Sequence, residues 1–109
     1  MIDMPLTLPC GAEIPNRLCK AAMTEGLATP AGEATPALNQ LYGLWSDGGA
    51  GLLLSGNVQI DGDHLERPGN VIIDGEPSAA MRTSLEAWAA AGTRAGNHFW
   101  AQISHAGRQ

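Results

Sequence analysis

Three neutral polar side chains follow apolar runs of the sequence, at points where a strand is expected to end. Thr24 follows "RLCKAAM", Asn57 follows "GLLLSG", and Gln102 lies within "HFWAQIS". Each side chain can take part in hydrogen bonds, and together they suit a heterocycle with amide-like edges better than a metal or a phosphate. They form one site only if the chain folds so that the three strand ends meet.

Two helices are predicted between the segments that carry these residues. Thr35 is a candidate N-cap, with Pro36 at the first helical position, and Pro77 is expected to open the second helix. Residues three and four apart place one apolar face on each helix, formed by Leu38, Leu41, Tyr42 and Trp45 and then by Met81, Leu85, Trp88 and Ala89.

Three strands are predicted over 17–23, 50–60 and 98–104, after a hairpin over 6–18, and 61–76 is expected to be irregular. Strands that alternate with helices form right-handed crossovers, which make the strands parallel. The uninterrupted apolar run of the middle strand predicts burial on both faces. Ligands of such folds bind at the carboxyl ends of the strands, so the three polar side chains are expected to converge there.

Composition excludes several classes of function. The 109 residues fit one small domain, and a net charge of −5 without a basic cluster argues against nucleic acid. No apolar stretch is long enough to cross a membrane, and the N-terminus does not resemble a secretory signal. Cys10 and Cys19 are interpreted as reduced thiols of a cytosolic protein, and Cys19 is expected to be buried and inert.

Two further motifs invite a ligand but favour a simpler interpretation. The glycines of "DGGAG" follow a helix and precede a strand, which is the reverse of a phosphate loop, so they indicate a helix end. The loop "DGDHLE" gathers Asp61, Asp63, His64 and Glu66, but it lacks the glycine of an EF-hand. A transition metal would need ligands from elsewhere in the chain. A hydrated loop is therefore favoured, and no metal is predicted.

Four segments give a more specific indication: "NRLCKAAMTEGLA", "GGAGLLLSGNVQID", "LERPGNVIID" and "QISHAGRQ". Their order and spacing resemble the N-terminal part of the old yellow enzyme family of FMN-dependent NAD(P)H:flavin oxidoreductases, over nearly the whole chain. The resemblance implies an α/β fold in which residues 1–109 form the N-terminal portion of a (β/α)8 TIM barrel, incomplete at the C-terminus. This portion comprises a floor hairpin, about three parallel strands and two helices.

The resemblance also implies an FMN site. It places four consecutive residues beside the flavin ring, namely Ala21, Ala22, Met23 and Thr24. Thr24 is the expected catalytic residue, because it would donate a hydrogen bond near the O4–N5 edge of the flavin. Asn57 would meet the flavin at the end of the middle strand, and Gln102 would pair with the pyrimidine edge. His105 and Arg108 belong to the "HAGR" signature, with either a structural or a functional role.

The implied activity is that of an ene-reductase, in which the flavin takes hydride from NAD(P)H and passes it to an activated alkene or a related small-molecule acceptor. A full-length relative would be cytoplasmic and can form a homo-oligomer. Barrels of this type need roughly 250 residues, and the family's substrate-anchoring and phosphate-binding residues lie on later strands. The isolated chain is therefore expected to be inactive. The alternative is a non-catalytic truncated α/β fragment or association module.

Overall fold

The computed structural model describes residues 1–108, and Gln109, the last residue of the "QISHAGRQ" segment, lies outside them. Its elements are β1 (Leu6–Thr7), β2 (Glu13–Ile14), β3 (Cys19–Lys20), α1 (Pro36–Asp47), β4 (Leu52–Gln59), β5 (Val71–Ile72), α2 (Ala79–Gly92) and β6 (His98–Ser104). The predicted alternation of strands and helices is confirmed. The expectation that 61–76 is irregular is wrong at β5, because this short strand pairs with the end of β4.

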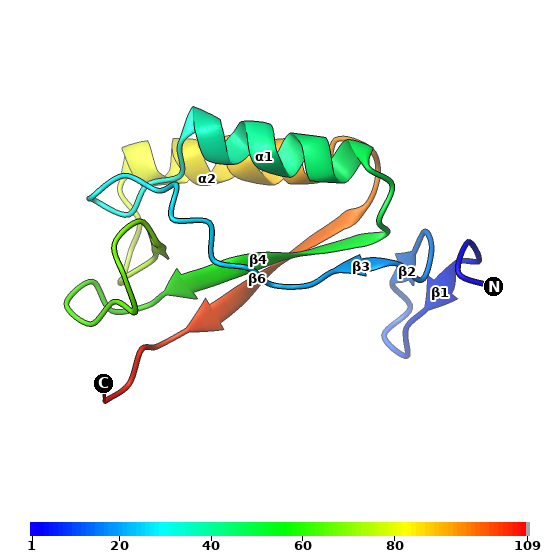
Figure 1. Cartoon of the computed structure of the whole chain (residues 1–109), viewed down its shortest axis with the longest axis horizontal. Helices are drawn as coiled ribbons and strands as arrows, with labels where there is room; N and C mark the ends of the chain where they lie inside the picture. Colours follow the sequence, from blue (N-terminus) through cyan, green and yellow to red (C-terminus); the bar gives the residue numbers. More distant parts are fainter. Residues whose placement is uncertain (109) are drawn as a thin grey trace.

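Strand β4 is the centre of a parallel sheet. β6 pairs along one edge of β4, while β3 and β5 pair with its beginning and its end, all in the parallel sense. The antiparallel hairpin β1–β2 lies where these strands begin (Figure 1). There the ring of His98 donates from Nε2 to the Glu13 carbonyl at 2.9 Å. The hairpin therefore lies at the opposite end of the sheet from the carboxyl ends of the strands.

Both helices pack on one face of this sheet (Figure 1). Thr35 caps α1 as predicted, because its side chain accepts the Leu38 N–H, while Ser78 caps α2, which begins two residues after Pro77. Ala89, predicted on the buried face of α2, is exposed. The core between helices and sheet comprises Leu38, Tyr42, Leu53, Val58, Val71 and Trp88. Neither helix within residues 1–108 is long and apolar enough to cross a membrane.

The other face of the sheet has no layer over it within residues 1–108. Leu52 and Leu54 are only half-buried, and Trp100, the cross-strand partner of Leu54, is exposed. The expectation that β4 is buried on both faces is therefore wrong. The prediction of a buried Cys19 is wrong for the same reason, because Cys19 pairs with Leu52 on this bare face and is exposed.

A bulge divides β4 into two halves. The pairing with β6 passes from Leu54 opposite Trp100 to Asn57 opposite Gln102, so β4 contains one residue more than its partner. Leu53 and Val58 both belong to the core although they lie five positions apart, which regular alternation along a strand would forbid. The bulge thus keeps the core continuous and leaves Asn57 on the bare face, beside Gln102.

Candidate functional site

The three polar residues predicted to converge do lie at the same end of the sheet. Gln102 donates from Nε2 to Oδ1 of Asn57 at 2.7 Å, and Thr24 donates from its hydroxyl to Oε1 of Glu66 at 2.8 Å. Asn70 connects the two pairs, because its Nδ2 donates to Glu66 and to the Asn57 carbonyl, both at 3.2 Å. These five residues are called the strand-end site below.

Glu66 is the charged member of the strand-end site. The Thr24 hydroxyl lowers the pKa of the Glu66 carboxyl, with smaller contributions from the amides of Asn70 and Asn57. Glu66 is therefore a carboxylate at neutral pH and holds the Thr24 hydroxyl proton. The sequence analysis assigns Glu66 to a hydrated loop. Glu66 also belongs to "LERPGNVIID", one of the segments that resemble the old yellow enzyme family, and this membership was the available signal that Glu66 contributes to the site.

A buried hydrogen-bond network holds the segment that carries Thr24. Tyr42 is fully buried, and its hydroxyl donates to Glu25 and accepts the Gly56 N–H at 3.0 Å. Burial, with the neighbouring Glu25 carboxylate, raises the pKa of Tyr42 well above its ordinary value. A side chain at Gly56 would come within 2.5 Å of the Met23 carbonyl oxygen, so residues 23–25 lie directly against β4.

The residues before Thr24 run along the edge of β4. Lys20 points into the helix layer, where its Nζ donates to the Leu54 carbonyl at 2.6 Å, and burial lowers its pKa. Ala21 and Met23 are exposed, and Ala22 is half-buried. The stretch predicted to lie beside a flavin is thus accessible to a ligand.

Buried polar atoms near the strand-end site lack partners. Gln59 lies two residues beyond Asn57 on β4 and is fully buried, yet neither Nε2 nor Oε1 finds a partner among the described residues. Within the same residues, Oδ1 of the buried Asn70 is also unpaired. Unsatisfied buried groups are costly, so these amides indicate positions for ordered internal water. Asn70 also lines a cavity of about 480 Å³, together with Leu65 and Ile72.

No family model matches the sequence, but curated relatives and solved structures do. The NADH-dependent flavin oxidoreductase iliE of Hypocrea jecorina (strain QM6a) is 34% identical over 108 residues, covering 98% of this chain and 27% of that protein. The protein of the same name from Neonectria sp. (strain DH2) is 37% identical over 106 residues, covering 96% of this chain and 14% of that protein. The chain therefore spans about a quarter or less of these relatives.

A solved structure gives the corresponding result for the fold. The old yellow enzyme homologue from Zymomonas mobilis matches with a TM-score of 0.77 and 25% identity, over 95% of this chain and 28% of that one. The fold class is thus part of an α/β barrel, with parallel strands and two helices but no closed barrel within residues 1–108. The predicted resemblance to the old yellow enzyme family is confirmed along nearly the whole chain.

Proposed function

We propose that this chain forms part of an FMN-dependent NAD(P)H oxidoreductase of the old yellow enzyme type. The observation that carries the proposal is the Asn57–Gln102 pair beside Thr24, at the carboxyl end of parallel strands. A ring edge with alternating donors and acceptors fits two adjacent amides, which offer both kinds of group. The relatives named as NADH-dependent flavin oxidoreductases add support.

The proposed roles follow from the contacts of each side chain. Gln102 and Asn57 bind the pyrimidine edge of the ring, and Ala21, Ala22 and Met23 border it. Thr24 is proposed as the catalytic residue: its hydroxyl, which donates to Glu66 in this structure, turns on binding to donate near the O4–N5 edge of the ring. When bound, FMN supplies the hydride chemistry, from NAD(P)H to an activated alkene or related acceptor.

The complete protein is proposed to act on a small-molecule electron acceptor in the cytoplasm, which fits the free thiols of Cys10 and Cys19. It can form a homo-oligomer, and neither nucleic acid nor membrane is proposed as a partner. The 109 residues alone are proposed to be inactive, since barrels of this type need roughly 250 residues. The alternative is a non-catalytic fragment or association module, which the bare face of the sheet favours.

The proposal is tested on the full-length natural protein. Its length is established by measuring the intact mass of that protein. We expect a yellow protein that releases FMN on denaturation and is bleached by NADH or NADPH. Gln102→Ala should weaken FMN binding by about 1–3 kcal/mol, because it removes hydrogen bonds to a buried ring edge. His98→Ala, at the other end of β6, is the control. A natural protein without flavin, or equal affinity in the Gln102 variant, would contradict the proposal.

A further inference from the structure

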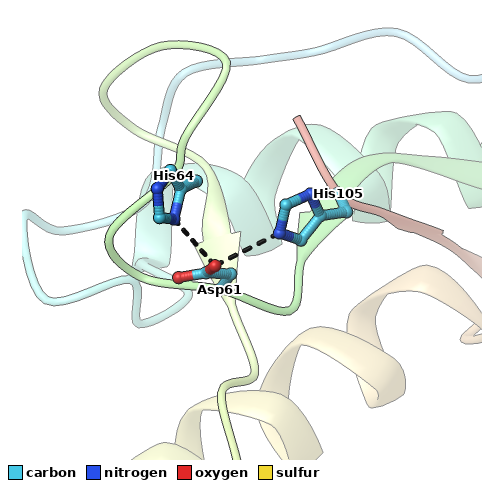
Figure 2. Close-up of side chains that lie close together, drawn as sticks. All are labelled: Asp61, His64 and His105. Carbon is cyan, nitrogen blue, oxygen red and sulfur yellow. Dashed lines mark hydrogen bonds and ion pairs between the residues drawn. The ribbon is translucent and has the colours of Figure 1, made fainter. Parts of the chain in front are cut away.

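A second cluster of side chains lies beyond the ends of β4 and β6. Asp61 and His64 belong to the loop that follows β4, and His105 directly follows β6. Figure 2 shows both imidazole rings directed at the carboxylate of Asp61. Nδ1 of His64 lies 2.8 Å from Oδ2 of Asp61, and Nε2 of His105 lies 3.2 Å from the same oxygen. The distant ligand that the loop sequence lacked is therefore supplied by His105.

We propose that Asp61, His64 and His105 bind one divalent transition-metal ion of the zinc type. The three ligand atoms all lie within 4.8 Å of one another. A tetrahedral zinc ion holds its nitrogen and oxygen ligands at about 2.0–2.2 Å, which places them roughly 3.3–3.6 Å apart, so each ligand atom needs to shift by about 1 Å or less. Two imidazoles with one carboxylate favour such an ion over Mg²⁺ or Ca²⁺, which prefer oxygen ligands alone.

The surroundings of the cluster suit an ion with open coordination positions. The side chains of Asp61, His64 and His105 are 31%, 62% and 44% exposed, so water can complete the coordination. The other carboxylate oxygen of Asp61 accepts the Asp63 N–H at 2.9 Å, which fixes the orientation of the carboxylate as outer-shell contacts do in metal sites.

Metal binding requires one rearrangement that can be observed. Nδ1 of His105 accepts the Gly107 N–H at 2.8 Å, so the neutral ring carries its proton on Nε2, which faces Asp61. When Nε2 binds the ion, that proton must move to Nδ1, and the Gly107 N–H loses its acceptor. In the same way, the His64 proton moves from Nδ1 to Nε2. The Gly107 amide is therefore a reporter of metal binding that lies outside the ligand set.

The experiment titrates the untagged chain with Zn²⁺ by calorimetry, in a Cys10→Ser/Cys19→Ser background that removes the two exposed thiols. We expect one ion per chain and no binding of Mg²⁺. His64→Ala and His105→Ala should each lower the affinity at least tenfold. His98→Ala removes the remaining histidine of the chain and should leave the affinity unchanged.

Two further measurements separate metal binding from effects on folding. The Gly107 amide signal in a 15N NMR spectrum should shift on addition of Zn²⁺, and should not respond in the His105 variant. Circular dichroism establishes that each variant is folded, and His64→Gln replaces His64→Ala if the latter is not. Absence of one-to-one saturation in the folded chain, or an equal loss with His98→Ala, would overturn the proposal.

Discussion

Tyr42 joins the core to the segment that carries Thr24 through a single hydroxyl group. The group donates to Glu25 in a partly buried contact and accepts from Gly56 in a buried one. Tyr42→Phe keeps the ring and deletes both hydrogen bonds, so we expect the free energy of unfolding to fall by about 1–3 kcal/mol. Urea denaturation measures this loss. Thr83→Ala deletes an exposed hydroxyl on α2 and should change stability by less than about 0.5 kcal/mol. Equal midpoints for the Tyr42 variant and the parent would contradict the assigned role.

The lowered pKa of Asp61 predicts how the free energy of unfolding depends on pH. Its pKa is lowered from 3.8 to about 2 in the folded chain, mainly by the Asp63 N–H and then by His64 and His105. The stabilisation is therefore present above pH 4 and is lost as the pH falls toward 2. Urea midpoints measured across this range should fall more steeply for the parent than for Asp61→Asn. Asp63→Asn is the matched control and should follow the parent, and identical slopes for all three chains would refute the prediction.

The strand-end site could be located from the sequence only in part. Thr24, Asn57 and Gln102 were found because each follows an apolar run, and parallel strands bring such positions together. Glu66 and Asn70 could not be found in this way, because they belong to a loop whose path is set by tertiary contacts rather than by periodicity. The pairing of Thr24 with Glu66 is a property of the folded loop.

At the scale of elements, Gly56 controls how closely the segment after β3 approaches β4. A Cβ at this position would lie 2.5 Å from the Met23 carbonyl oxygen, and backbone atoms cannot move aside easily. We expect Gly56→Ala to cost about 1–3 kcal/mol by overpacking, as measured by urea denaturation. Gly62→Ala is the control, because its Cβ would meet nothing nearer than 3.6 Å. A Gly56 variant as stable as the Gly62 variant would show that the segment adjusts freely.

The strength of the local signal decides which elements could be predicted. β6 occupies the predicted residues 98–104, because its apolar run has no competing interpretation. The regular pairing of β3 covers only Cys19–Lys20 of the predicted strand over 17–23, since β3 pairs with nothing beyond the beginning of β4. β5 was missed because two residues carry no periodicity, and their pairing depends on β4.

At the scale of the whole molecule, the sheet leaves apolar surface in contact with solvent. β6 pairs only with β4 within residues 1–108, so its outer edge is open, and Ile103 on this strand is 59% exposed. We expect the isolated chain to self-associate in sedimentation velocity as its concentration rises. Ile103→Lys should reduce this association. Leu44→Lys, at an equally exposed position on α1, should not. A parent chain that stays monomeric at all concentrations would contradict the prediction.

The bulge in β4 also determines which genetic changes the strand can accept. Before it, odd-numbered residues such as Leu53 face the helices, and after it, even-numbered residues such as Val58 do. A substitution leaves this parity intact, whereas the loss of one codon between Leu54 and Asn57 would restore simple alternation. Leu53 and Val58 would then lie four positions apart, so regular alternation would keep Val58 in the core and Asn57 on the bare face. The strand can therefore lose its extra residue without exchanging the residues of its core and of its site.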